Sequence, residues 1–151
     1  MTWPPAFHTR LARLGDVPTL VDLLKQLGYP VDAPTLSDRL DRLLGRPLVH
    51  RVLVAPAAQD EAKLLGALHA SRRETIESED YAEIAALVVD ESARKTGVGK
   101  ALVAAAERWA RDLGMNAVRV RSNVVRSGAH AFYERLGYRV LKQQMAFLKE
   151  L

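Results

Sequence analysis

The fold is decided by a stretch that reads Val88-Val89-Asp90-Glu91-Ser92-Ala93-Arg94-Lys95-Thr96-Gly97-Val98-Gly99-Lys100. It follows an apolar strand expected over 81–89 and opens a helix expected over 97–113, whose apolar residues recur on one face. The first turn of a helix has unpaired backbone N–H groups and a partial positive charge, and glycines there let a phosphate approach the backbone. Arg94, Lys95 and Lys100 add formal charge. The stretch therefore predicts a turn that binds a diphosphate.

Two other phosphate-binding motifs do not fit these residues. A Walker loop ending at Lys100 requires glycine at 94 and serine or threonine at 101, but the chain has Arg94 and Ala101. A dinucleotide fingerprint beginning at Gly97 requires glycine or alanine at 102, where the chain has Leu102. The alternative interpretation is structural: the glycines only allow the strand and the helix to pack closely.

Outward from this stretch, apolar periodicity predicts the remaining elements. We expect helices near 16–28, 35–44, 97–113 and 128–136, the first of them capped by Asp16. We expect strands near 7–12, 48–55, 64–71, 81–89, 117–122, 138–141 and 145–148. This order predicts an α/β fold of the mixed α+β kind, in which helices pack on a mixed sheet.

Composition narrows the class of protein. The chain has 151 residues, enough for one domain with a substantial core, and no cysteine, which excludes disulfides and Cys-ligated zinc. Its four histidines show no metal-ligand spacing, so we expect no metal. We see no signal-peptide pattern and no run of ~18 apolar residues, and we therefore expect a cytoplasmic protein with no membrane partner.

The net charge of +4 is compatible with nucleic acid, an anionic membrane or a phosphate-bearing cofactor. The chain has no basic helix with base-reading residues and no aromatic-basic RNA signature. The positive residues gather partly around the glycine turn instead. A nucleic-acid-binding domain is therefore an alternative that we do not favour.

Two motifs carry a family resemblance. Arg94-x-x-Gly97-x-Gly99, between a strand and a helix, resembles motif A of the GNAT superfamily of N-acetyltransferases. Downstream, Ala129-His130-Ala131-Phe132-Tyr133-Glu134-Arg135-Leu136-Gly137-Tyr138 resembles its motif B. Motif spacing, element order and total length also agree. The resemblance covers the C-terminal half well and the N-terminal half only in general terms.

This resemblance implies a single GNAT domain over 1–151, with an acceptor side in the N-terminal half and an acetyl-CoA-binding core at 81–138. The expected sheet is central, mostly antiparallel and of about six to seven strands, flanked by about four helices. The implied reaction moves an acetyl group from acetyl-CoA to a primary amine by direct attack. The expected acceptor is a small molecule or a peptide whose identity the sequence does not give. A homodimer is a further expectation for the chain.

The resemblance also implies which residues hold acetyl-CoA. The end of the strand would bond pantetheine through its backbone, and the turn would bind the pyrophosphate. The residues implied are Leu87, Val88, Val89, Arg94, Lys95, Thr96, Gly97, Val98, Gly99, Lys100, Asn123 and His130.

Acetyl transfer to an amine requires a base, because a lysine-like amine has a pKa near ~10.4. Glu83 is the candidate, since it lies in an apolar strand that resembles the one carrying a glutamate base in the histone-acetylating branch. Simple alternation places Glu83 on one face with Ala85, Leu87 and Val89, although the bulge usual in the family would change this parity. The alternatives are a water chain as the base, or an exposed edge glutamate.

Tyr133 is the candidate acid, because the family's tyrosine at this motif position points at the acetyl-CoA sulfur. The alternative is a core aromatic beside Phe132. A CoA-binding sensor that has lost catalysis is a further alternative for the whole chain. The presence of both Glu83 and Tyr133 favours the enzyme.

Overall fold

The computed structural model describes residues 6–121 and 127–151. The chain divides into two compact units, residues 1–120 and 121–151, and each is described by itself. The first unit contains β1 (Arg10–Leu11), η1 (Leu14–Asp16), α1 (Val17–Leu27), α2 (Ala33–Leu44), β2 (His50–Ala57), β3 (Asp60–Arg73), β4 (Tyr81–Val89), η2 (Glu91–Ala93), α3 (Val98–Asp112) and β5 (Val118–Val120). The second contains α4 (Ser127–Arg135).

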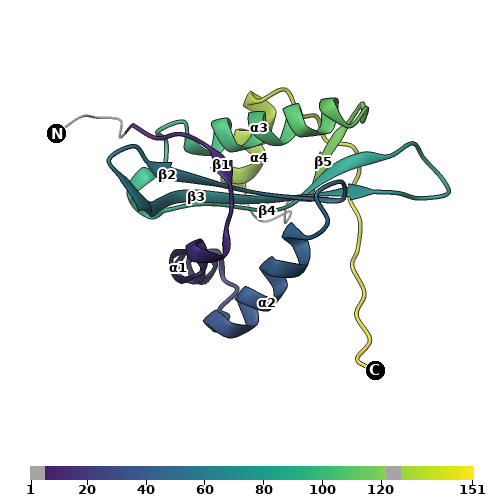
Figure 1. Cartoon of the computed structure of the whole chain (residues 1–151). Coiled ribbons are helices and arrows are strands. Elements are labelled where there is room, and N and C mark those ends of the chain that lie inside the picture. Colours follow the sequence, from purple (N-terminus) through teal and green to yellow (C-terminus); the bar gives the residue numbers. More distant parts are fainter. Residues whose placement is uncertain (1–5, 122–126) are drawn as a thin grey trace. The chain divides into compact units, whose positions relative to one another are not determined.

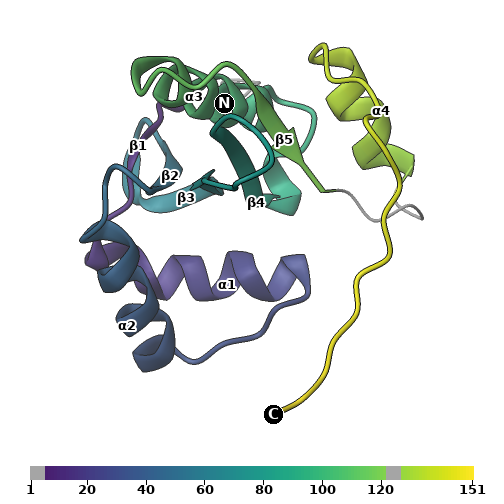
Figure 2. The same cartoon turned by 90° about the vertical axis from the view of Figure 1, so that its right-hand side faces the viewer.

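The sheet of the first unit has the order β1-β2-β3-β4-β5 (Figure 2). The pairs from β1 to β4 are antiparallel, and β4 with β5 is parallel. The predicted mixed, mostly antiparallel sheet is confirmed, with five strands in the described part of the chain.

The expected strands near 138–141 and 145–148 are wrong, because residues 138–151 form neither helix nor strand. Apolar side chains in this segment, such as Val140 and Phe147, are exposed. A strand exists only where a second strand accepts its ladder of hydrogen bonds. Apolar residues at strand-like spacing predict the conformation of one segment, but they do not supply that partner.

Helices cover both faces of the sheet in the first unit (Figure 1). On one face, α1 and α2 bury Leu20, Leu23 and Leu40 against sheet residues that include Val54 and Val88. On the other face lies α3, whose buried side includes Leu102, Val103 and Trp109. Each such side chain contributes roughly 1.5–3 kcal/mol by leaving water. The interior strand β4 is thus packed against helices on both faces.

Gly66 on β3 allows α3 to approach the sheet closely. A Cβ at this position would lie 2.9 Å from the Val88 carbonyl oxygen, 2.9 Å from Val98 Cγ1 and 3.1 Å from Leu102 Cδ1. These distances are shorter than ordinary carbon contacts, so a larger residue would push the helix away. Sequence analysis did not identify this role for Gly66.

An aspartate lies at the N-terminus of both α1 and α2, but only the one at α2 caps its helix through the side chain. Asp16 does not cap α1; its carboxylate instead accepts hydrogen bonds from Arg10 Nη1 and Nη2, both at 2.8 Å, and from the Arg13 backbone N–H at 2.9 Å. Asp32 caps α2 by accepting from the Thr35 backbone N–H at 2.8 Å. The Asp16 side chain therefore ties β1 to the beginning of α1.

Candidate active site

The turn between β4 and α3 has the shape expected of a binding turn. Gly97 precedes α3 with φ 92°, in the left-handed region, and Lys95 also has a positive φ of 63°. A Cβ built on Gly97 would meet no protein atom within 4 Å, so the space above this residue is open. The sequence needs glycine here for its backbone conformation, and not for close packing.

The first turn of α3 offers free hydrogen-bond donors. Its first hydrogen bond runs from the Ala101 N–H to the Gly97 carbonyl oxygen at 3.0 Å. Among the described residues, none accepts from the N–H groups of Val98, Gly99 or Lys100. The neighbouring Arg94, Lys95 and Lys100 side chains are exposed. Unpaired amides, a helix N-terminus and three cations together fit a doubly charged phosphate ligand.

Gln26 of α1, which is far away in the sequence, holds the loop before this turn by hydrogen bonds. Gln26 Nε2 donates to Asp90 Oδ1 at 2.8 Å, and the Glu91 backbone N–H donates to Gln26 Oε1 at 3.1 Å. Asp90 in turn accepts from the Ser92 backbone N–H at 3.0 Å, and Thr96 Oγ1 donates to the Ala93 carbonyl. Sequence analysis missed Gln26, because its partners lie 64 and 65 residues away.

A bulge in β4 changes which residues share a face with Glu83. His69 on β3 pairs with Ala86, but the next residue of β3 pairs with Ile84, so Ala85 is extra. Glu83 therefore lies on the same face as Ala86 and Val88, and the alternation that grouped it with Ala85, Leu87 and Val89 is wrong. Since Val88 packs with α1 and α2, Glu83 faces that side of the sheet.

The Glu83 carboxylate is held near one cation. Its side chain is 12% exposed, and its Oε2 atom lies 3.8 Å from Arg73 Nε. On the neighbouring strand, Arg119 pairs with Glu83 along the backbone and covers the Tyr81 ring at 4.0 Å. Glu83 is thus a mostly enclosed acid, and not the exposed edge residue of the alternative interpretation.

Strands β4 and β5 separate beyond Ile84. The recorded pairs end at Ile84 with Val120, whereas β4 continues to Val89. Among the described residues, no strand pairs with this edge of β4 over 85–89. Leu87, Val88 and Val89 lie in this part, directly before the turn at 94–100. The first unit therefore joins an open strand edge to a helix N-terminus.

The second unit carries the motif that contains Tyr133. Gly137 ends α4 with φ 92°, its N–H donates to the Glu134 carbonyl at 3.0 Å, and the Tyr138 N–H donates to the Tyr133 carbonyl at 3.0 Å. This helix ending folds the Tyr138 ring to 5.7 Å from that of Tyr133. Burial raises the pKa of Tyr133 to about 12, so the hydroxyl keeps its proton at neutral pH.

The structure brings together some of the expected site residues. Leu87 to Val89 and Arg94 to Lys100 adjoin in the first unit, with Glu83 on the same strand. His130 and Tyr133 lie together on α4 in the second unit. Asn123 lies outside the described residues.

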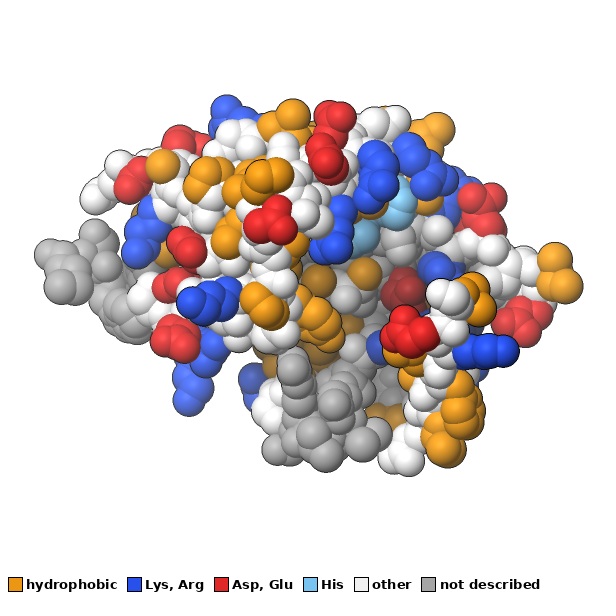
Figure 3. Space-filling view, turned by 90° about the horizontal axis from the view of Figure 1, so that it is seen from below, with side chains coloured by type: hydrophobic (Ala, Val, Ile, Leu, Met, Phe, Trp, Pro, Cys, Tyr) orange, Lys and Arg blue, Asp and Glu red, His pale blue; other side chains and the backbone are white. Residues whose placement is uncertain are grey.

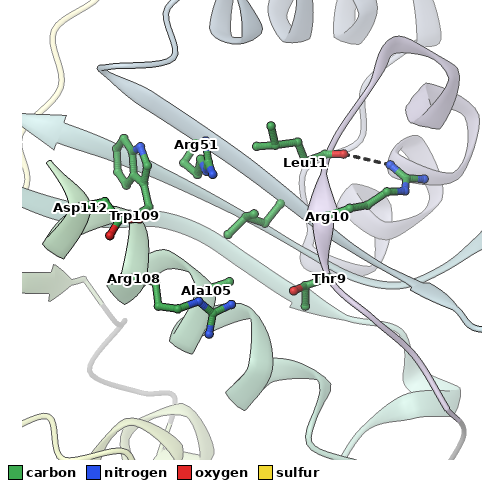
Figure 4. Close-up of a pocket in the computed structure, with 9 residues that line it drawn as sticks. Thr9, Arg10, Leu11, Arg51, Ala105, Arg108, Trp109 and Asp112 are labelled. Carbon is green, nitrogen blue, oxygen red and sulfur yellow. Dashed lines mark hydrogen bonds between the residues drawn. The ribbon is translucent and has the colours of Figure 1, made fainter.

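A cavity of about 210 Å³ lies elsewhere in the first unit, between α3 and the strands β1 and β2 (Figure 4). Arg51 and Trp109 line it, and the Arg51 Nε atom is buried without a partner among the described residues. Arg51 alternates with Val52, which packs under α1 and α2, so the cavity is on the face opposite Glu83. It is not part of the candidate active site.

Taken together, the sheet, the bulge and the glycine turn define an α/β protein that presents a helix N-terminus at the end of the interior strand β4. A model of the acetyltransferase (GNAT) family matches residues 19–138, and the chain therefore belongs to this family. The chain is an N-acetyltransferase of a family that uses acetyl-CoA as co-substrate. The resemblance noted in the sequence is confirmed.

Solved structures agree over nearly the whole chain. A GNAT family acetyltransferase from Staphylococcus aureus is 25% identical with a TM-score of 0.72, covering 97% of this chain and 99% of that one. Glucosamine-6-phosphate N-acetyltransferase from Arabidopsis thaliana is 19% identical with a TM-score of 0.82, covering 96% and 99%. An aminoglycoside 6'-N-acetyltransferase from Acinetobacter haemolyticus is 19% identical with a TM-score of 0.80, covering 95% and 99%. No curated protein sequence gives a significant match.

Two features are absent from the described residues. None of their helices is both long enough and apolar enough to cross a membrane. No group of three or more His, Cys, Asp or Glu side chains among them is arranged to hold a metal ion.

Proposed function

We propose that this chain acetylates a primary amine by direct attack on acetyl-CoA bound along β4 and at the turn before α3. The observation that carries the proposal is the run from the open edge at 85–89 to the unpaired amides of Val98, Gly99 and Lys100. Pantetheine contains amide groups that can pair with a free strand edge, and a pyrophosphate suits a helix N-terminus. One continuous surface would therefore hold both parts of the cofactor.

Glu83 is the proposed base, acting on the amine directly or through a water. It faces the side of the sheet that α1 and α2 cover, whereas α3 occupies the other side. An amine entering on the α1 and α2 side would meet an enclosed carboxylate. Such a group can accept the proton that a protonated amine must lose before attack.

Tyr133 is the proposed donor to the departing thiolate. With a pKa of about 12, it stays protonated and available as a hydrogen-bond donor. Full proton transfer to a thiolate, whose conjugate acid has a pKa near ~8.5, would be uphill by about 3.5 units, or roughly 5 kcal/mol. We therefore assign Tyr133 the role of stabilising the sulfur by a hydrogen bond, with solvent supplying the final proton.

The experiment is a thiol-release assay with acetyl-CoA and a panel of amines. Two of the structural neighbours act on aminoglycosides and on an amino-sugar phosphate, so both classes belong in the panel, beside polyamines and lysine peptides. Amine-dependent thiol release supports the enzyme. Acetyl-CoA binding without release by any amine would instead support the CoA-binding sensor.

The Glu83 assignment is tested in the same assay. Glu83→Gln should reduce activity most at low pH, where a protonated amine depends most on a base. An unchanged rate across pH would remove Glu83 from the mechanism. A cytoplasmic location, a homodimer and the absence of nucleic-acid and membrane partners stay predictions from the sequence.

A further inference from the structure

Two histidines far apart in the sequence form a pair in the first unit. His50 Nδ1 lies 3.1 Å from His69 Nε2, a hydrogen-bonding distance, and the ring centroids are 5.2 Å apart. His50 begins β2 and alternates with Val52 and Val54, which pack under α1 and α2. His69 on β3 pairs with Val52 along the backbone. Both histidines therefore occupy the same face of the sheet as Glu83.

The pair lies beside the bulge that turns Glu83 toward this face. His69 pairs with Ala86 at the bulge, and Ser71, two residues later on β3, pairs with Glu83. Diagonal neighbours on one face of a sheet are roughly 7–8 Å apart, a distance that a single water can bridge between long side chains. Figure 3 views this face, where histidine side chains lie among Lys and Arg side chains.

Both rings are neutral at physiological pH. Burial, with a smaller effect of His50, lowers the pKa of His69 to about 4. Burial and the nearby Arg46 charge lower the pKa of His50. Glu83, Arg73 and Arg119 also carry charge on this face. A neutral imidazole has one donor nitrogen and one acceptor nitrogen, so each ring can take up a proton at one side and release one at the other.

The nitrogens that face away from the pair are not sealed inside the protein. Among the described residues, Arg51 Nε is the only buried side-chain nitrogen or oxygen atom that lacks a hydrogen-bond partner. No hydrogen bond links His69 Nδ1 or His50 Nε2 to another described residue, and neither atom is buried without a partner, so both are open to solvent in the described part of the chain. The two rings form a hydrogen-bonded chain that ends at His69 Nδ1, on the side of Glu83, and at His50 Nε2 at the other end.

We propose that His69 and His50 form a proton outlet for the acceptor amine, on the side of the sheet that carries Glu83. The inference rests on the proposed acetyl transfer. The amine N–H bond breaks and its proton passes to Glu83 or to water. A proton then binds His69 Nδ1, the His69 Nε2 proton moves to His50 Nδ1, and His50 Nε2 releases a proton to solvent. One proton enters and one leaves, and both rings end neutral in the opposite tautomer. Reorientation of the two rings restores the starting tautomers before the next turnover.

The test compares His69→Ala and His50→Ala with His8→Ala, each assayed on an amine found active with the wild-type protein. His8 is the matched control, because it pairs with Glu61 at 3.0 Å and takes no part in the histidine pair. We expect kcat to fall roughly 10- to 100-fold in the His69 and His50 variants, with the KM for acetyl-CoA unchanged. His8→Ala should keep the wild-type kcat.

Added imidazole distinguishes a relay from a structural pair. We expect imidazole to restore a concentration-dependent part of kcat in His69→Ala, because a free ring can occupy the space and carry the proton. Wild-type kcat in His69→Ala, or a reduced kcat that imidazole leaves unchanged in a variant with wild-type thermal stability, would overturn the relay. No amine-dependent turnover by the wild-type protein would overturn the proposed function, and the relay with it.

Discussion

Replacing Gly97 by alanine separates its binding role from its backbone role. Gly97 has φ 92° and a Cβ would meet no protein atom within 4 Å, so the substitution adds backbone strain and no internal clash. Such strain costs about 1–2 kcal/mol, which for a chain of this size lowers Tm by about 2–8 °C. Gly114 is the matched control: it follows the same helix, has φ 80°, and also has open space at its Cβ position.

Both variants should therefore lose similar stability, and only one should lose affinity. We expect Gly97→Ala to weaken acetyl-CoA binding roughly 10- to 150-fold, the value of about one charge-assisted hydrogen bond. The added methyl group would hold the phosphates away from the α3 amides. Isothermal titration calorimetry gives both affinities, and calorimetric unfolding gives both Tm values. Equal acetyl-CoA affinities in Gly97→Ala and Gly114→Ala would refute the placement of the diphosphate at this turn.

Three further predictions address other parts of the account. Tyr133→Phe should lower kcat roughly 10- to 150-fold by removing one hydrogen bond to a developing charge, with the acetyl-CoA dissociation constant unchanged; a wild-type kcat would make Tyr133 a core aromatic. Gly66→Ala should lower the free energy of unfolding by about 1–3 kcal/mol, because its Cβ would lie 2.9 Å from the Val88 carbonyl oxygen. Urea unfolding measures this free energy. An unchanged urea midpoint would show that α3 can move away from the sheet without loss of stability. Burial raises the pKa of Asp16, but the hydrogen bonds from Arg10 and Arg13 outweigh this effect and leave the pKa below its usual value. The contribution of ionised Asp16 to stability should therefore be complete above about pH 4 and be lost as the pH falls through the folded-state pKa. Asp16→Asn should cost about 1.5–3 kcal/mol at pH 7, because Arg10 keeps Glu61 as a second partner, and it should remove that part of the acid dependence. Wild-type and Asp16→Asn acid unfolding curves that superimpose would contradict this.

The segments that sequence analysis predicted best are those with local signals. The strand 81–89 is apolar apart from Glu83, and its bounds agree with β4. The helix expected near 97–113 is bounded by Gly97 and Gly114, which both have a positive φ. Glycines that bound a helix in this way are visible in the sequence. Motifs A and B depend on such short-range features, and the family was recognisable for this reason.

Long-range pairing accounts for what was missed. The extra residue Ala85 in β4 is defined only by its absence from the pairing with β3, so alternation alone assigned Glu83 to a face with the wrong neighbours. The apolar residues near 138–148 lack a paired strand in the described structure. The pairing of His50 with His69 is not visible in the sequence, because 19 residues separate them and only the antiparallel pairing of β2 with β3 brings them together.

Acetyl transfer from acetyl-CoA to an amine is tested by the stoichiometry of the reaction with one active amine. Mass spectrometry quantifies the acetylated amine, and a thiol reagent quantifies free CoA in the same samples. We expect one acetylated amine for each CoA released. We also expect loss of both products in Gly97→Glu, which places a carboxylate where the diphosphate should bind. Thiol release without acetylated amine, or undiminished product formation by Gly97→Glu, would contradict these expectations.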